Sequence, residues 1–273
     1  MRAYLGGLAF VAALSASPAM AQDGEATPAF TVTGTAALLS DYRFRGVSQS
    51  DKEMAVQAGL TLTHKSGLYA GAWGSNLAGW GTFGGANIEL DLIAGYKTAI
   101  SEKGAIDVGL TWYMYPGGAD VTDFAEPYVK LSGTTGPVSL LAGVAYAPKQ
   151  RALGNFSATP QSRGQKQDNL YVWGDAAAPI AGTPLTAKAH LGFSKGNPGL
   201  GPNGTSVAPT GEYLDWLLGL DFTVKNLTLG VAYADTDISR AESANLQPGF
   251  SKRGNGVTSI AGGTIIVSLT AAF

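Results

Sequence analysis

The chain has 273 residues and a formal net charge of −2, and 14% of its residues are charged. This balance gives no reason to expect a nucleic acid partner, because no basic excess is available to bind a polyanion. With no cysteine and only two histidines, the sequence disfavours a zinc site, and we expect no metal and no other cofactor.

The first 21 residues have the pattern of a cleaved signal peptide. Arg2 is followed by the apolar run "AYLGGLAFVAALSA", and "AMA" at residues 19–21 has the small-x-small form of a cleavage site. A membrane anchor is the alternative, but the apolar run is short for a spanning helix. We therefore expect residues 1–21 to be removed on export and residues 22–273 to form one domain.

Apolar and polar residues alternate with a period of two along most of the remaining chain. Near the C-terminus, Ile265, Val267 and Leu269 share one face, while Ser268 and Thr270 lie on the other. Such alternation is typical of strands with one apolar face. It predicts twelve strands, at about residues 30–46, 54–63, 68–75, 87–97, 106–113, 124–132, 137–147, 168–179, 185–194, 213–223, 226–235 and 264–273.

Short and long connections alternate between these predicted strands. The short ones lie at residues 64–67, 101–104, 132–136, 180–184 and 225–226, and the long ones at 46–52, 75–86, 116–123, 148–167, 195–211 and 236–258. Outer-membrane barrels have short periplasmic turns and longer extracellular loops. We therefore expect an all-β fold: a single antiparallel up-and-down transmembrane β-barrel of about 12 strands, in the bacterial outer membrane, with both termini periplasmic.

A soluble β-sandwich is the alternative, since its strands also alternate. The predicted strands are ~10 residues or longer, however, whereas strands of soluble proteins centre on about 5–6 residues. Aromatic residues also gather at the two ends of the apolar faces, where membrane interfaces favour them. We expect such interface positions for Tyr42, Phe44, Tyr96, Trp112, Phe193, Trp216 and Phe273.

The run "LSDYRFRGVSQSD" at residues 39–51 concentrates charges and rings in a chain that has few charges. If the first strand continues through it, alternation places Tyr42 and Phe44 toward lipid at the outer rim. The same alternation places Asp41, Arg43 and Arg45 toward the barrel interior. The run therefore predicts two stripes with separate roles on opposite faces of one strand.

The arginines of this run are expected to meet acids across the first hairpin. Either Arg45 lies opposite Asp51 and Arg43 opposite Glu53, or Arg45 itself lies opposite Glu53. Opposite charges across a hairpin contribute about 0.2–1 kcal/mol each. The pairs either fix the hairpin structurally or form a positive patch on the pore wall, and the sequence leaves both interpretations open.

Further charges fall on the inward faces of the predicted strands. We expect the pore lining to comprise Asp41, Arg43, Arg45, Glu53, Glu89, Asp91, Asp107, Glu126, Lys130, Lys188, Asp215 and Asp221. Barrels of eight strands are filled by side chains, whereas 16–18 strands enclose an open channel. Twelve strands lie between these cases, so a narrow conduit and a lumen plugged by ion pairs and a folded-in loop both stay open.

The run "SDYRFRGVSQSD", close behind the expected cleavage site, resembles the TorF-type porin family of bacterial outer-membrane proteins, also called the Gcw_chp family. The signal sequence, the strand pattern and the terminal Phe273 agree with this resemblance over the whole mature chain. The resemblance implies a porin-like barrel, and it brings no catalytic residue.

We therefore expect an outer-membrane channel for passive diffusion of small polar solutes or ions through a narrow charged lumen. The alternative is a structural or surface-binding barrel with a plugged lumen. The expected partners are outer-membrane lipid and, through the terminal strand ending at Phe273, the barrel-assembly machinery. We expect no enzyme, because neither His64 nor His190 belongs to a nucleophile–base pair at the lipid-facing surface.

Overall fold

The computed structural model describes residues 28–273 except 158 and 200–205. The expected signal peptide, residues 1–21, lies outside the described residues. Twelve strands in the described part of the chain close into one antiparallel barrel, which confirms the predicted fold class. These strands are β1 (Phe30–Leu39), β4 (Ala55–His64), β5 (Leu68–Asn76), β6 (Ile88–Ser101), β7 (Gly104–Met114), β8 (Phe124–Thr135), β9 (Val138–Gln150), β10 (Gln167–Pro179), β11 (Leu185–Gly196), β12 (Glu212–Val224), β13 (Leu227–Thr236) and β14 (Thr264–Ala272).

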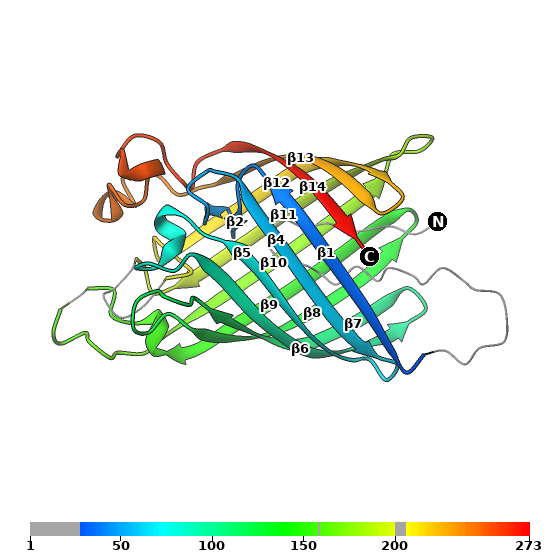
Figure 1. The fold of residues 1–273 in the computed structure, drawn as a ribbon, viewed down its shortest axis with the longest axis horizontal. Coiled ribbons are helices and arrows are strands. Elements are labelled where there is room, and N and C mark those ends of the chain that lie inside the picture. Colours follow the sequence, from blue (N-terminus) through cyan, green and yellow to red (C-terminus); the bar gives the residue numbers. More distant parts are fainter. Residues whose placement is uncertain (1–27, 158, 200–205) are drawn as a thin grey trace.

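Each strand pairs with its sequence neighbour, and the ladder closes between β1 and β14. Short turns join the strands at the end where β1 begins and β14 ends, and the longer connections project from the opposite end (Figure 1). The long connections carry the short 3-10 turns η1 (Gly79–Thr82), η2 (Arg151–Leu153), η3 (Ala244–Leu246) and η4 (Lys252–Gly254). Among the described residues, no helix is long and apolar enough to cross a membrane.

The outer wall of the barrel is apolar. Side chains alternate in and out along each strand, and the large hydrophobic residues of the outward face are exposed, such as Leu218 at 62% and Ile265 at 66%. In water such a continuous apolar belt would be costly, whereas lipid accepts it. A closed barrel also leaves no sheet edge with unpaired backbone groups. The chain is therefore a transmembrane β-barrel.

The barrel closes at a short seam between its first and last strands. β1 and β14 share five paired residues, from Thr35 opposite Ala272 to Leu39 opposite Ser268, whereas β1 and β4 share ten. At the short-turn end, Gly34 and Phe273 exchange backbone hydrogen bonds of 2.7 and 3.0 Å. The Phe273 ring covers Gly34, leaving no room for a Cβ there.

The first strand is shorter than predicted. We expected it to run to residue 46, but β1 ends at Leu39, and residues 41–50 turn into the barrel as a small hairpin. The hairpin pairs β2 (Arg43–Phe44) with β3 (Val47–Ser48). Its turn is formed by Arg45 and Gly46, both with positive φ (50° and 78°). Positive φ cannot continue a strand, so the alternation ends there.

Candidate functional site in the barrel lumen

Residues 41–50, which we call the plug hairpin, fill the lumen near the long-loop end. All ten residues are buried. Asp41 organises the hairpin by accepting hydrogen bonds from Arg43 Nε at 2.9 Å and Ser48 Oγ at 2.5 Å. Gly46 allows close contact with the barrel wall, because a Cβ there would collide with Thr236 and lie 2.7 Å from Asp215 Cβ.

Arg45 at the hairpin tip connects the plug to the barrel wall. Its guanidinium donates to both carboxylate oxygens of Glu126 on β8, at 2.6 and 2.7 Å, and to Asn169 Oδ1 on β10 at 2.7 Å. The guanidinium also lies 4.2 Å from the centre of the Tyr171 ring. Tyr213 on β12 donates its hydroxyl to the Arg45 carbonyl at 2.9 Å. One buried arginine is therefore held by three strands.

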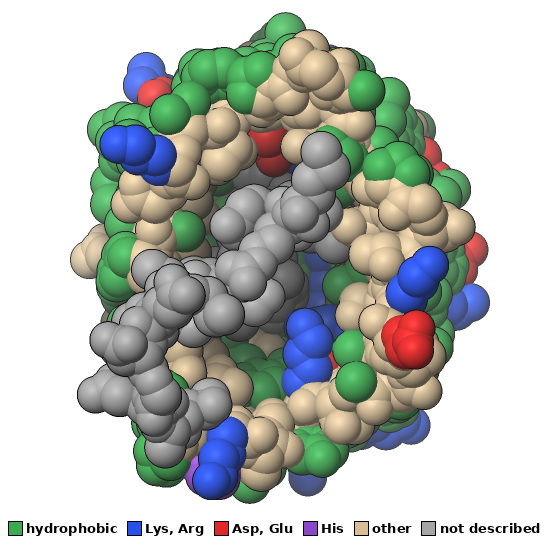
Figure 2. Space-filling model, turned by 90° about the vertical axis from the view of Figure 1, so that its right-hand side faces the viewer, with side chains coloured by type: hydrophobic (Ala, Val, Ile, Leu, Met, Phe, Trp, Pro, Cys, Tyr) green, Lys and Arg blue, Asp and Glu red, His purple; other side chains and the backbone are tan. Residues whose placement is uncertain are grey.

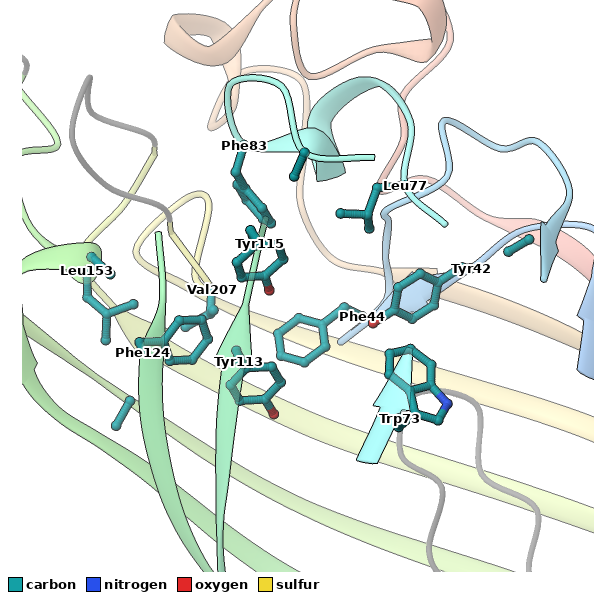
Figure 3. Close-up of a cluster of buried hydrophobic side chains, with 14 residues drawn as sticks. Tyr42, Phe44, Trp73, Leu77, Phe83, Tyr113, Tyr115, Phe124, Leu153 and Val207 are labelled. Carbon is teal, nitrogen blue, oxygen red and sulfur yellow. The ribbon is translucent and has the colours of Figure 1, made fainter. Parts of the chain in front are cut away.

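A cluster of aromatic residues packs around the plug hairpin (Figure 3). Phe44 meets Tyr113 edge-on with ring centres 5.7 Å apart, and Tyr113 stacks on Phe124 at 4.5 Å. Tyr42 meets Trp73 edge-on at 5.5 Å. These rings come from the hairpin and from β5, β7 and β8, so the outer half of the lumen is a packed core.

A second inward segment covers this core from the long-loop side. It spans residues 77–86 and includes η1 (Gly79–Thr82). Phe83 packs on Tyr115 with ring centres 4.7 Å apart, and the Ala78 amide donates to the Gln49 carbonyl of the plug hairpin at 3.0 Å. At Gly81, a Cβ would collide with the Gln49 backbone. The two inward segments therefore lock against each other.

Two predictions about the first hairpin are wrong. Tyr42 and Phe44 do not face lipid; they are 2% and 8% exposed, inside the barrel. The physical reason is the turn at Arg45 and Gly46, which sends both faces of the run into the lumen. The expected cross-hairpin ion pairs are absent from the described residues as well, because Arg43 pairs with Asp41 and Arg45 with Glu126.

Glu53 is the one predicted pore-lining residue that the described structure places outside the lumen. Its side chain is 46% exposed among the long loops, where it contacts Lys252 and Arg253 at 2.9 Å each. The Lys252 hydrogen bond and charge lower the pKa of Glu53, and Arg253 adds to the effect. The neighbouring Asp51 accepts the Arg253 amide at 2.9 Å.

The other predicted lining residues face inward. Asp41, Arg43, Arg45, Glu89, Asp91, Glu126, Asp215 and Asp221 are buried, and Asp107, Lys130 and Lys188 are partly exposed. Glu89 accepts the hydroxyl of Tyr42 at 2.9 Å. Lys130 lies 3.9 Å from the centre of the Tyr128 ring. That these residues line a conducting path stays a prediction.

Between the plug hairpin and the short-turn end, charged side chains on the inner face of the barrel pair with one another. Lys188 on β11 contacts Asp221 on β12 at 2.5 Å. His190 contacts Asp175 through Nδ1 at 2.7 Å and Asp215 through Nε2 at 3.1 Å. No three His, Cys, Asp or Glu side chains in the described chain are placed to hold a metal ion together. These charged side chains therefore contact each other between neighbouring strands.

The short-turn end of the lumen differs from the long-loop end. In Figure 2 this end is hollowed, and lysine or arginine side chains are visible inside the opening beside the grey residues. The Lys188–Asp221 pair is about one-tenth exposed, and the His190 and Asp175 side chains are 19% and 20% exposed. The described lumen therefore combines a tightly packed outer half with a more open inner half.

The remaining predicted interface aromatics lie on the outer wall. Tyr96 and Trp112 are each 43% exposed and Phe273 is 64% exposed. Phe193 and Trp216 are partly exposed on the outward faces of β11 and β12. Their role at the membrane interfaces stays a prediction.

Sequence reasoning missed the residues that receive the plug hairpin. Asn169, Tyr171 and Tyr213 all contact Arg45, and His190 joins the same network through the Tyr171 hydroxyl at 2.9 Å. These residues lie more than 100 positions away from the plug hairpin in the chain, and no local sequence pattern signals their contact with Arg45.

The family model described as "bacterial protein of unknown function (Gcw_chp)" matches residues 23–273. No curated protein matches the chain. Among solved structures, a porin is 9% identical with a TM-score of 0.41, over 89% of this chain and 99% of that chain. An outer membrane channel from Pseudomonas putida F1 is 10% identical with a TM-score of 0.45, over 93% and 100%. The channel DcaP of Acinetobacter baumannii is 11% identical with a TM-score of 0.40, over 89% and 97%. The family match covers almost the whole chain, so the protein belongs to the Gcw_chp family of bacterial proteins, as the run at residues 39–51 predicted.

Proposed function

We propose that the protein is a narrow outer-membrane channel for passive diffusion of small polar solutes or ions, whose long-loop end is closed in this conformation by the plug hairpin. Charged rings at a pore wall set ion preference, and a polar lumen tolerates charges that a dry core would not. In our proposal the long loops are extracellular, and both termini are periplasmic.

The charged inner half of the lumen is the observation that carries this proposal. The Lys188 and Asp221 side chains are about one-tenth exposed and those of His190 and Asp175 about one-fifth exposed, on the inward face of a closed barrel. A barrel with only a structural role needs no charge on that face, and burying ions without water is costly. The described residues form a hollow at the short-turn end (Figure 2), and in our proposal solutes reach these groups from there.

A non-conducting barrel is the second candidate function, and the packed outer half favours it. The plug hairpin is buried throughout, and Arg45 is anchored to three strands. If this hairpin never leaves the lumen, no solute crosses. The two candidates thus differ in one property, the mobility of residues 41–50.

Single-channel recording in planar lipid bilayers separates the two candidates. The test compares wild type with Gly46→Val, whose side chain cannot fit against Thr236 and Asp215 and whose φ of 78° a branched residue resists. We expect small or infrequent steps for wild type and larger, more frequent steps for the variant. Silence from both proteins at all voltages would contradict the channel.

The control variant is Gly182→Val. Gly182 has a nearly identical φ of 77°, but it lies in a short turn where a Cβ meets nothing within 4 Å. The control thus carries the same backbone strain without touching the plug hairpin. It is expected to conduct like wild type, and equal gains in both variants would mean that general destabilisation, not plug release, opens the barrel.

Insertion into the membrane is a separate part of the proposal. We propose that the barrel-assembly machinery recognises the terminal strand β14 together with Phe273, whose ring is exposed on the outer wall. Outer-membrane lipid then covers the apolar belt. Deleting Phe273 is expected to lower the amount of heat-modifiable, folded protein in the outer membrane, measured against a Phe273→Tyr control.

A further inference from the structure

The outer half of the lumen holds more buried acids than bases. Glu89 and Asp91 on β6 and Glu126 on β8 are each at most 4% exposed. Glu126 is neutralised by Arg45, and the other arginine of the plug hairpin, Arg43, is paired with Asp41. Within the described chain, neither Glu89 nor Asp91 forms a salt bridge.

Glu89 and Asp91 differ in how their oxygens are satisfied. Glu89 accepts hydrogen bonds from the hydroxyls of Tyr42 at 2.9 Å and Tyr115 at 3.4 Å. Asp91 Oδ1 is fully buried and has no hydrogen-bond partner among the described residues. A buried carboxylate oxygen without a donor or a cation is strongly unfavourable. Asp91 is therefore neutralised either by a proton or by a cation that the described side chains do not supply.

A second oxygen without a partner lies next to Asp91. The Thr111 hydroxyl on β7 is fully buried and also has no partner in the described chain. In the strand register, Asp91 lies opposite Tyr113 and Thr111 opposite Glu126. Thr111 is thus the diagonal neighbour of Asp91 on the same inward face, within reach across the ladder. A hydroxyl oxygen carries lone pairs that can accept from a donor or bind a cation.

Aromatic rings flank the same position. Asp91 lies between Trp73 on β5 and Tyr113 on β7 in the strand register, and all three residues are buried. The faces of such rings attract cations in desolvated surroundings. The buried carboxylates and the hydroxyl together form a neighbourhood that favours positive charge and repels anions.

We propose that Asp91, together with Glu89 and Thr111, binds a monovalent inorganic cation such as Na⁺ or K⁺ within the lumen. Three acids or histidines able to hold one metal ion together are absent from the described residues, which argues against a chelated divalent metal. A monovalent ion needs fewer charged ligands and accepts neutral oxygens and water. The inference rests on the proposed channel only in that the ion enters through the open inner half of the lumen.

Thermal unfolding of the purified protein in detergent tests this site without any conduction. The midpoint is measured in NaCl, in KCl and in N-methyl-D-glucamine chloride at matched ionic strength. We expect the midpoint to rise by about 2–4 °C or more in the salt whose cation binds, relative to the bulky organic cation. Equal midpoints in all three salts would overturn the proposal and indicate that Asp91 is protonated instead.

Variants assign any cation effect to this position. In Asp91→Asn the uncompensated charge is removed, so the midpoint in N-methyl-D-glucamine chloride should rise and the dependence on the cation should vanish. Thr111→Val keeps the shape of the side chain and should weaken the dependence of the midpoint on the cation. It replaces Asp91→Asn as the test if that variant does not refold. Glu212→Gln, at an exposed ion pair with Lys195, is the control and should keep the wild-type dependence. A cation effect that persists unchanged in both lumen variants would exclude the site.

The outcome is distinguishable from that of the channel proposal. If stability depends on the cation and this dependence is lost in Asp91→Asn, but no variant conducts, the cation site is supported and the channel is contradicted. If the protein conducts but its unfolding midpoint does not depend on the cation, the channel is supported and the cation site is contradicted.

Discussion

Arg45 is the residue on which the closed end of the lumen depends. Its guanidinium binds Glu126, Asn169 and the face of Tyr171 in a fully buried setting. Removing one partner of a buried ion pair leaves an uncompensated charge, which costs about 3–5 kcal/mol. Replacing both partners by apolar residues of similar volume is far less costly.

We therefore expect Arg45→Ala and Glu126→Ala each to lower the free energy of unfolding by about 3–5 kcal/mol. The double variant Arg45→Met with Glu126→Leu should lose much less than the sum of the two. Urea unfolding of the protein in lipid vesicles measures all three. Additive losses would mean that the two side chains act independently despite their 2.6 Å contact.

The contact of Glu53 with Lys252 predicts a pH-dependent loop. Because the folded pKa of Glu53 is lowered by Lys252, this contact stabilises the loop above the ordinary pKa of a glutamate and is lost as the pH falls through the lowered value. We expect the connection between β13 and β14 to gain mobility as the pH falls below the ordinary pKa of a glutamate.

A spin label at Val257→Cys reports this change, since the protein has no cysteine of its own and Val257 is exposed. The mobility of the label should rise at acidic pH in the wild-type background. Glu53→Gln should show high mobility at every pH, and a transition that survives in this variant would mean that another group titrates.

Single residues also show where sequence reasoning succeeds and fails. Alternation placed Glu89, Asp91 and Glu126 inward, because they lie inside regular strands whose pleat fixes the side-chain direction. It failed for Tyr42 and Phe44, because their direction depends on the backbone turn at Arg45 and Gly46. A non-glycine residue with positive φ leaves no reliable mark in a sequence.

Pairs of neighbouring strands pack inward aromatic rings over glycines. Trp173 on β10 lies opposite Gly143 on β9, and Tyr128 on β8 lies opposite Gly109 on β7. At Gly143 a Cβ would collide with the Trp173 ring, and at Gly109 it would lie 2.5 Å from the Tyr128 ring. The glycines thus give the rings space to lie flat along the lumen wall.

Gly143→Leu is therefore expected to lower the free energy of unfolding by about 1–3 kcal/mol through overpacking against Trp173. Gly174→Leu is the control on the paired strand: this glycine lies on the outward face, where a Cβ would have only the Leu141 carbonyl oxygen nearby, at 3.7 Å. Urea unfolding and the tryptophan emission of both variants provide the readout. Equal losses would show that glycine replacement in a strand, not the ring contact, sets the cost.

Among the strands and loops, the twelve barrel strands and the alternation of short and long connections were predictable, since both follow from local sequence patterns. The plug hairpin was not. Its sequence reads as a continuation of the first strand, and its inward position is fixed by contacts with β8, β10 and β12. Contacts between segments this far apart have no local signature.

The whole molecule is a closed transmembrane β-barrel with an apolar outside and a largely polar inside. Leu60 and Thr61 are adjacent in β4 and point to opposite faces, and Leu60 is 53% exposed on the outer wall. Arginine in the middle of the lipid-facing surface costs about 2–4 kcal/mol, whereas lumen substitutions are better tolerated.

We expect Leu60→Arg to lower the free energy of unfolding in lipid vesicles by about 2–4 kcal/mol. Thr61→Arg should lower it clearly less. Urea titration of both variants in the same vesicles makes the comparison. If Thr61→Arg cost as much as Leu60→Arg, the inner half of the lumen would be as dry as the membrane, contrary to the hollowed end in Figure 2.

The seam between β1 and β14 has a consequence for the order of assembly. It joins strands from the two ends of the chain, so closing it restricts a longer loop than any other strand pair requires, yet it has five paired residues where β1 and β4 have ten. The largest entropic cost therefore falls on a short ladder. We infer that the hairpins zip first, each on a nearby neighbour, and that the barrel stays an open curved sheet until β14 meets β1. A newly made chain thus spends its last folding step with these two strand edges exposed, and there a chaperone or a second copy has its best opportunity to pair with it.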